Sequence, residues 1–362
     1  MKKGWRDYNV LREAWCVTDH EPRNTHHDRA EVMSFIEVSH LHKEFKIARH
    51  HRGAGGAVRN LFSREYRTVR AVNDVSFTID AGELVGYLGP NGAGKSTTIK
   101  MLTGILVPSS GQVRVAGRVP WQQRVEHARG IGVVFGQRTN LWWDLPVIES
   151  LDLLRYVYRV PEERYERNLA EFRELLGLSD FINTPVRSLS LGQRMRADLA
   201  GALLHDPQII FLDEPTIGLD VVAKERIRQF IKTINRERGV TVILTTHDLG
   251  DVQKLCERVM MIDRGQLLFD GSPNDLLVRF GGERELVVDF AEDSIDFSID
   301  GAQVVQRDGR RVTYRFARGE ISASELIQRL SARYRIEDLS VQEPQIEDTV
   351  RRIYEQGLLR EK

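Results

Sequence analysis

Short runs of apolar residues alternate with longer amphipathic segments through the middle of the chain. Runs such as residues 84–88 and 131–135 are too short for buried helices, and each stops at a glycine, which predicts buried strands. Residues 193–204 and 222–237 carry apolar side chains at helical spacing, which predicts amphipathic helices between the strands. Strands that alternate with helices predict a mainly parallel sheet covered on both faces, so the expected fold class is α/β.

The same rules predict further elements around these segments. Residues 146–178 have helical spacing over most of their length, which predicts a mainly helical region. The other predicted strands lie at residues 35–41, 71–79, 113–115, 209–212, 240–246 and 259–262, and another helix lies at residues 249–255. In such a sheet, ligands bind at the edge formed by the carboxyl ends of the strands.

Changes in pattern divide the chain into three parts. Residues 1–33 lack periodicity and contain a polar cluster, which predicts a disordered extension and makes Met33 a candidate start codon. Residues 34–278 would form the main domain, with a helical subdomain at about residues 138–205. Residues 281–362 would form a small α+β domain. Its predicted strands lie at residues 285–290, 311–316 and 336–341, and its predicted helices at residues 323–334 and 346–356.

A basic insertion interrupts the main domain at about residues 46–66. From His42 to Arg70 the chain carries eight lysines and arginines against two glutamates. Charge runs usually form solvated surface, so we interpret the segment as a surface insertion. The alternative is a patch that lies near anionic lipid headgroups or the acidic face of a partner.

Overall charge and composition narrow the class of protein. The chain has 362 residues, with 52 Lys and Arg against 52 Asp and Glu, so it lacks the basic surplus of a dedicated nucleic-acid binder. Its two cysteines are too few for a disulfide framework, which favours a reducing compartment. No window approaches the roughly 18–20 apolar residues of a membrane span, and nothing near the start resembles a signal peptide. We therefore expect any membrane association to involve a partner or a surface.

The segment after the strand at residues 84–88 carries the clearest chemistry. Residues 89–96 read GPNGAGKS, which matches the phosphate-loop pattern G-x-x-x-x-G-K-S/T. The glycines let backbone N–H groups approach an anion, Lys95 brings a positive charge to the outer phosphates, and the Ser96 hydroxyl is placed to bind Mg²⁺. A nucleotide is therefore expected here. The candidate contact residues are Gly89, Pro90, Asn91, Gly92, Ala93, Gly94, Lys95, Ser96 and Thr97.

Two carboxylates follow another predicted buried strand. Asp213 and Glu214 end the apolar run at residues 209–212, where a metal-holding aspartate belongs in phosphoryl-transfer sites. Asp213 would bind Mg²⁺, and Glu214 would orient or deprotonate the attacking water. Without the phosphate loop upstream, an ordinary acidic turn before Pro215 would be the preferred interpretation.

Three other candidates are weak when each is taken alone. The sequence LSLGQ at residues 189–193 places Ser190 and Gly192 at the start of a predicted helix, which is either a second anion site or a simple serine cap. Gln137 and His247 each follow a predicted strand. A lone residue of this kind at a strand end is more often a structural hydrogen-bonding residue than a catalytic one.

In their order along the chain, these motifs resemble the nucleotide-binding subunit of an ABC transporter over roughly residues 35–275. The resemblance implies a P-loop NTPase of the ABC ATPase type, with a parallel sheet core and a helical subdomain. The matching motifs are the phosphate loop at residues 89–96, the Q-loop glutamine Gln137, the signature at residues 189–193, the Walker B strand with Asp213 and Glu214, the D-loop at residues 218–220 and the switch histidine His247.

The resemblance also implies a role for each motif. In that family two subunits, identical or different, enclose two ATP molecules, so the signature of one subunit would act on the nucleotide of the other. His247 would contact the γ-phosphate, and Gln137 would link Mg²⁺ to the transport partner. The implied catalytic residues are Lys95, Glu214 and His247, the implied Mg²⁺ ligands are Ser96, Gln137 and Asp213, and the implied ATP contacts outside the phosphate loop are Phe45, Gln137, Ser190, Gly192 and Gln193.

Two positions depart from the usual family pattern, and one contact is ambiguous. Leu191 stands where glycine is commonest in the signature, and Gly218 stands where alanine is usual in the D-loop. Neither change removes the serine and glycine that contact phosphate, so we expect hydrolysis to survive. The aromatic side chain that stacks on adenine is either Phe45, by its distance from the first strand, or Tyr66, by its closeness to the second; we favour Phe45.

The expected function follows from the same resemblance. We expect the ATP-hydrolysing subunit of an exporter, bound at the cytoplasmic face of the cell membrane to a separately encoded ABC-type-2 permease. Trp142 and Trp143 would either face that permease or lie buried in the helical subdomain. The expectation of export rests on residues 341–348, which resemble the tail of ATPases that serve such exporters.

Two other functions are considered. A soluble ABC ATPase that acts on ribosomes or DNA would typically carry two cassettes or a long coiled-coil insertion, and this chain has neither; its neutral charge also disfavours nucleic acid as a partner. A nucleotide-binding regulator without turnover is disfavoured by the presence of Glu214 and His247.

Overall fold

The computed structural model describes residues 34–48, 66–136, 138–246, 249–280, 283–292, 297–317 and 320–342, together with Val350 and Ile353. Several predictions fall outside these residues: the disordered extension, most of the basic insertion, the Q-loop glutamine, the switch histidine and nearly all of the C-terminal helix.

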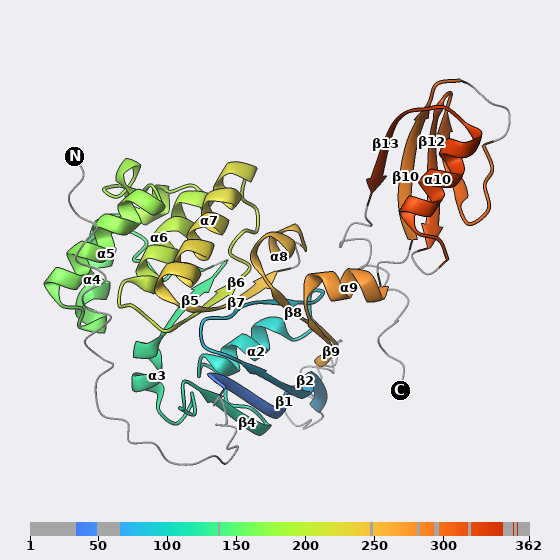
Figure 1. The fold of residues 1–362 in the computed structure, drawn as a ribbon. Coiled ribbons are helices and arrows are strands. Elements are labelled where there is room, and N and C mark those ends of the chain that lie inside the picture. The colour runs from blue at the N-terminus through green and yellow to red at the C-terminus, as the bar shows by residue number, and fades with distance from the viewer. Residues whose placement is uncertain are drawn as a thin grey trace, which may run out of the picture. The chain divides into compact units, whose positions relative to one another are not determined.

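A six-stranded sheet forms the centre of the main domain (Figure 1). The strands lie in the order β5-β6-β7-β3-β8-β9, and all neighbours are parallel except β8 and β9. Because β3 lies between β7 and β8, the phosphate loop that follows it starts from an interior strand. The strands are β3 (Leu84–Leu88), β5 (Ile131–Phe135), β6 (Ile209–Asp213), β7 (Thr241–Thr246), β8 (Arg258–Asp263) and β9 (Gln266–Gly271).

Alternate residues of the sheet strands enter two different cores. In β6, Ile209 and Phe211 pack into one core, and Ile210 and Leu212 pack into the other. This follows from the two-residue period of a strand. Since both faces of the sheet are covered, both sets must be apolar, and the strand reads as a continuous apolar run.

Helices cover one face of this sheet (Figure 1). The helices in this core include α4 (Val147–Tyr158), α5 (Glu162–Leu175), α6 (Leu191–Leu203), α7 (Val221–Arg238) and α8 (Leu249–Leu255), and 3-10 turns lie at Leu178–Asp180 and Val186–Ser188. The predicted helical region at residues 146–178 is two helices, because Arg159 takes a left-handed backbone conformation with φ 56° and Pro161 caps the next helix. None of the helices in the described residues is long and apolar enough to cross a membrane.

An antiparallel sheet of three strands shares the other core with α2 (Lys95–Leu102). Its order is β2-β1-β4, formed by β1 (Ile36–Ala48), β2 (Tyr66–Ile79) and β4 (Ser110–Val115). The helix α3 (Arg124–Gly130) leads from this sheet to β5.

The first two strands are longer than the sequence predicts. Their pairing continues from Glu44 opposite Arg70 to Ala48 opposite Tyr66, so both ends of the predicted insertion form a two-stranded ribbon. Glu44 and Arg70 form an ion pair at 2.8 Å, and opposite charges across a strand pair stabilise it. The many charged residues concealed this strand pattern in the sequence.

The C-terminal part is a small α+β unit, as predicted. Its antiparallel sheet has the order β11-β12-β10-β13, and α10 packs Leu326 and Leu330 into a core that contains Leu286, Tyr314 and Phe316. The elements are β10 (Glu283–Phe290), β11 (Gln303–Asp308), β12 (Arg311–Ala317), α10 (Ala323–Arg333) and β13 (Ile336–Gln342), and α9 (Pro273–Phe280) precedes them.

Candidate functional site

The phosphate loop needs its glycines for two different reasons. At Gly89 an added Cβ would lie 2.4 Å from the Ile262 carbonyl oxygen, so the close packing leaves no room for a side chain. Gly92 and Gly94 have φ values of +82° and +113°, a backbone conformation that L side chains rarely adopt. Gly94 is also the N-cap of α2, where no side chain supplies a cap, so first-turn N–H groups of this helix are available to an anion.

Lys95 lies folded over the loop that contains it. Its Nζ donates hydrogen bonds to the carbonyl oxygens of Gly89 at 2.5 Å and Pro90 at 3.3 Å, and lies 4.0 Å from Glu214 Oε1. Burial lowers the pKa of Lys95, while the Glu214 and Asp213 carboxylates oppose that shift. The cation is thus held between the loop and the two acidic residues.

Asp213 lies beside the phosphate loop although it is distant in sequence. Its Oδ1 accepts a hydrogen bond from Ser96 Oγ at 3.2 Å and one from Thr245 Oγ1 at 2.5 Å. A carboxylate and a hydroxyl are hard oxygen ligands that suit Mg²⁺, which commonly takes one or two protein ligands and completes its shell with phosphate and water. The described residues contain no group of three or more Asp, Glu, His or Cys side chains that could hold a metal ion, so the donor set fits Mg²⁺ with a nucleotide better than a metal held by protein alone.

The backbone at Glu214 is strained. Glu214 has φ 56°, a value that non-glycine residues rarely adopt, and strain of this kind is concentrated at functional sites. Its N–H donates to the carbonyl oxygen of Thr245 at 3.0 Å and to Thr245 Oγ1 at 3.2 Å, which fixes the turn after β6.

Two further residues, Thr245 and Gly136, support this turn and match no motif in the sequence. Thr245, fully buried in β7, lies directly opposite Asp213. Gly136 follows β5 and donates its N–H to the Asp213 carbonyl oxygen at 2.7 Å. In the sequence, Thr245 is a hydroxyl residue at the end of an apolar strand. Its role at Asp213 can be inferred only once β7 is known to lie beside β6.

Ser96, Asp213 and Glu214 line one cleft of about 600 Å³. It contains cationic, acidic and hydroxyl groups, as expected for a site that holds a polyanion together with a metal ion. The lining residues are Asn91, Ser96, Lys100, Ile105, Phe135, Gly136, Arg138, Asp213, Glu214 and Ile217.

The signature forms a separate surface. Ser190 caps α6: its Oγ accepts from the Gln193 N–H at 3.2 Å, and Gln193 Oε1 accepts from the Ser190 N–H at 2.9 Å, which is a capping box. Ser190 is exposed, and neither it nor Gly192 is among the described residues that line the cleft. In one chain, the cleft and the signature are therefore distinct sites. Leu191, which departs from the family pattern, is the first residue of α6.

The D-loop glycine has a conformational reason. Gly218 has φ +69°, which explains a glycine at a position where alanine is usual in the family. Asp220 caps α7 by accepting a hydrogen bond from the Ala223 N–H at 2.8 Å.

A buried ion pair joins the elements behind the cleft. Asp251 of α8 is fully buried and accepts a hydrogen bond from Arg228 Nε of α7 at 2.7 Å. The Thr216 hydroxyl, two residues beyond Glu214, donates to the same carboxylate. This pair connects the turn after β6 with α7 and α8.

Some predicted contacts are not settled by this geometry. Gln137 and His247 lie outside the described residues. The described strands that precede them reach the site: Phe135 of β5 pairs with Asp213, and Thr246 of β7 pairs with Leu88, next to the phosphate loop. Phe45 is half-buried in β1, with Lys43 Nζ 5.2 Å from its ring centroid, and Tyr66 is exposed at the end of β2. Neither aromatic residue lines the described part of the cleft, so the choice of Phe45 stays a prediction.

Comparison with known proteins gives the family. The family described as ABC transporter matches residues 72–217. The ABC transporter ATP-binding protein NatA of Bacillus subtilis is 37% identical over 215 residues, which is 59% of this chain and 87% of the relative. The chain belongs to the ABC transporter ATP-binding proteins. Members of this ABC ATPase family hydrolyse ATP to power transport, so the chain is the ATP-binding and ATP-hydrolysing subunit of a transporter.

Other similarities agree with this assignment. The Nod factor export ATP-binding protein I of Rhizobium leguminosarum bv. viciae is 40% identical over 216 residues, covering 59% of this chain and 68% of that protein. The dimeric post-hydrolysis structure of the ATP-binding cassette MJ0796, bound to ADP and Pi, has a TM-score of 0.55 and 28% identity, and covers 66% of this chain and 98% of that one. ABC ATPases work with transmembrane permeases and form dimers.

Proposed function

We propose that the cleft binds ATP with Mg²⁺ and that Glu214 activates the water that attacks the γ-phosphate. The observation that carries this proposal is the meeting of two distant segments of the chain, the phosphate loop and the end of β6. Ser96, Asp213 and Glu214 line one cleft, and Lys95 Nζ lies 4.0 Å from Glu214 Oε1. Lys95 would then stabilise the negative charge that spreads over the transferred phosphoryl group. Ser96 and Asp213, together with Gln137, would hold Mg²⁺, which when bound neutralises phosphate charge.

The second half of each site would come from another subunit. Ser190 and Gly192 lie away from the cleft of their own chain and at the exposed start of a helix, a position suited to an anion. In a dimer of ABC ATPases, this surface would meet the γ-phosphate held by the partner, and His247 would contact the same phosphate from the cleft side.

The proposed transport role is export through a permease of the ABC-2 type at the cytoplasmic face of the membrane. The support comes from relatives named for export or drug resistance, such as the Nod factor export protein and the linearmycin resistance protein LnrL of Bacillus subtilis. The Trp142 and Trp143 side chains are 41% and 49% exposed, which favours a permease contact over a buried role. Nothing in these relatives' names points to ribosomes or DNA.

The test is the substitution Glu214→Gln, which removes the carboxylate base and keeps the shape of the side chain. We expect this variant to bind ATP, to accumulate as an ATP-bound dimer on size-exclusion chromatography, and to release phosphate about 100-fold more slowly than the wild type. Glu237→Gln makes the same chemical change on a half-exposed glutamate of α7 and should behave as the wild type. Normal phosphate release by Glu214→Gln would show that the base is another residue.

A further inference from the structure

Asp198 is a buried carboxylate that the proposed hydrolysis does not use. It lies on α6, six residues after Gly192 of the signature, and is only 4% exposed. Its Oδ1 accepts a hydrogen bond from Thr139 Oγ1 at 2.8 Å and one from the Asn140 N–H at 2.9 Å. Burial raises the pKa of Asp198 to about 6 although both hydrogen bonds favour the charged form, so retaining an acid here is energetically costly.

The contacts of Asp198 belong to a stripe along one face of α6. Arg194, Asp198 and Gly201 are spaced by four and three residues, so they lie on the same side of the helix. The Arg194 guanidinium lies 5.6 Å from the centroid of the Trp143 ring. At Gly201 an added Cβ would lie 3.3 Å from Leu141, so the missing side chain lets Leu141 pack closely on the helix. Residues 139–143, just after the Q-loop glutamine, are therefore attached to α6 at three points.

The same segment is also tied to the rest of the domain. Asn140 Nδ2 donates to the Val133 carbonyl oxygen of β5 at 2.8 Å, and the Trp142 N–H donates to Ser150 Oγ of α4 at 3.2 Å. Among the hydrogen-bond acceptors of this segment named here, Asp198 lies on α6, whereas Val133 lies on β5 and Ser150 on α4.

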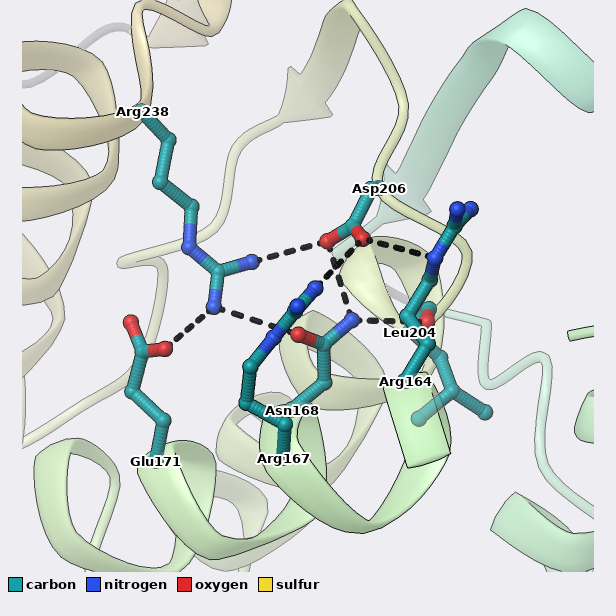
Figure 2. A network of polar contacts seen from close by, with 7 residues as sticks. All are labelled: Arg164, Arg167, Asn168, Glu171, Leu204, Asp206 and Arg238. Carbon is teal, nitrogen blue, oxygen red and sulfur yellow. Dashed lines mark hydrogen bonds and ion pairs between the residues drawn. The ribbon is translucent and has the colours of Figure 1, made fainter. Parts of the chain in front are cut away.

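The far end of α6 is fixed by a second polar network, which Figure 2 shows. Asn168 Nδ2 of α5 donates to the Leu204 carbonyl oxygen at 3.0 Å and to Asp206 Oδ1 at 2.9 Å. Arg238, at the end of α7, donates to Asp206 at 3.1 Å and forms an ion pair with Glu171. Polar contacts therefore hold α6 at Asp198, near its middle, and at Leu204 and Asp206, just beyond its C-terminal end.

We propose that Asp198 is a positioning residue that fastens the segment after Gln137 to the signature helix α6. A movement of Gln137 that accompanies nucleotide binding in one cleft would then move Ser190 and Gly192, which act on the nucleotide of the partner subunit. The two nucleotide sites of the dimer, and the Trp142–Trp143 surface proposed to face the permease, would respond as one unit. This inference rests on the proposed roles of Gln137 and the signature.

The experiment compares variants that separate this role from general stability. Asp198→Ala removes the acceptor of both hydrogen bonds. Asp198→Asn keeps the Oδ1 atom that accepts them, and Thr139→Val removes one donor with little change of shape. The matched control is Asn235→Ala, which removes two hydrogen bonds from α7, to the carbonyl oxygens of Gly82 at 2.7 Å and Val240 at 2.9 Å, and touches neither α6 nor residues 139–143.

Two measurements are made on each variant in the Glu214→Gln chain. Hydrogen–deuterium exchange across residues 138–143 reports the attachment, and the ATP concentration at half-maximal dimer formation reports the coupling. Asp198→Ala should raise both the exchange rate and that concentration about tenfold, and Thr139→Val should raise them about threefold, because charge-assisted hydrogen bonds are lost. Asp198→Asn and Asn235→Ala should stay within about twofold for both. Binding of a fluorescent ATP analogue to dilute monomer should be unchanged throughout.

The outcomes distinguish this inference from the function on which it rests. If the parent Glu214→Gln chain dimerises with ATP and Asp198→Ala dimerises at the same ATP concentration, Asp198 does not couple the sites, and only the inference falls. If Asp198→Asn raises the exchange rate and the ATP concentration for dimer formation as much as Asp198→Ala does, loss of the two hydrogen bonds is not the cause of these effects. The inference is then also overturned. If the parent chain binds ATP without forming a dimer, the proposed dimeric function fails and this inference fails with it.

Discussion

The substitution Gly136→Ala would add one methyl group where β5 meets the carboxylates that end β6. An ideal Cβ at Gly136 would lie 2.5 Å from the Glu214 carbonyl oxygen and 2.8 Å from the Asp213 carbonyl oxygen, both of which are backbone atoms. Ordinary van der Waals contact begins at 3.4 Å, so the Glu214 carbonyl would have to retreat by about 0.9 Å. Because the Gly136 N–H also binds the Asp213 carbonyl oxygen, the whole turn would be displaced.

This displacement should affect hydrolysis far more than nucleotide binding. A misplacement of about 1 Å in a catalytic group can lower the rate by about 100-fold, so we expect kcat for ATP hydrolysis to fall by about that factor. The KM for ATP should change by no more than about threefold, because the phosphate loop follows β3 and not β5. The added methyl should also lower the free energy of unfolding by about 1–3 kcal/mol, as overpacking does.

Steady-state phosphate release as a function of ATP concentration measures both kinetic parameters, and a thermal melt verifies that the variant is folded. The matched control is Gly130→Ala at the end of α3, where the nearest heavy atom to an added Cβ is Arg118 Nη1 at 3.6 Å. It should hydrolyse ATP as the wild type does. A Gly136→Ala variant with kcat within about threefold of wild type would refute the placement of the catalytic carboxylates at this turn.

Three further predictions concern buried polar groups. Because burial raises the pKa of Asp198 from 3.8 to about 6, the folded protein favours the neutral acid; this stabilisation is complete below about pH 4 and is lost as the pH rises through 6, in total about 3 kcal/mol. The unfolding free energy of the wild type relative to Asp198→Asn should therefore fall between about pH 4 and 6 in chemical denaturation; a difference that does not vary with pH would contradict this. Asp251→Ala leaves the Arg228 guanidinium buried without its main partner and should cost about 3–5 kcal/mol in the same assay, and a loss below about 1 kcal/mol would show that the ion pair is not supporting these helices. Thr245→Val removes the hydroxyl that orients Asp213 and should raise the Mg²⁺ concentration for half-maximal hydrolysis by about tenfold; an unchanged Mg²⁺ dependence would remove Thr245 from the metal site.

The sequence predicts the parts of the site that are encoded locally. The phosphate loop has an eight-residue pattern between a strand and a helix, and each of its glycines has a steric or conformational reason in the structure. The α/β fold is predicted as well. Alternate residues of a run such as 209–212 pack into the cores on the two faces of the sheet, so every residue of the run is apolar.

The residues that could not be predicted depend on which distant segments become neighbours. Thr245 matters because β7 lies beside β6, and Gly136 matters because β5 lies on the other side of β6. Asp198 reads as one polar residue in an amphipathic helix, and only the fold shows that it is buried against Thr139 and Asn140. The ribbon of β1 and β2 was concealed because its side chains are mostly charged or exposed, so no apolar period marks it.

The central claim is that this ABC ATPase drives a separate membrane permease. It is tested most directly by tagged purification of the native chain from detergent-solubilised membranes, with the co-purifying proteins identified by mass spectrometry. We predict recovery of a multi-spanning protein in stoichiometric amount, together with ATP hydrolysis by the complex that Glu214→Gln slows about 100-fold. Recovery of the chain without any membrane protein, bound instead to ribosomal proteins or nucleic acid, would contradict the transport function and leave only the ATPase chemistry.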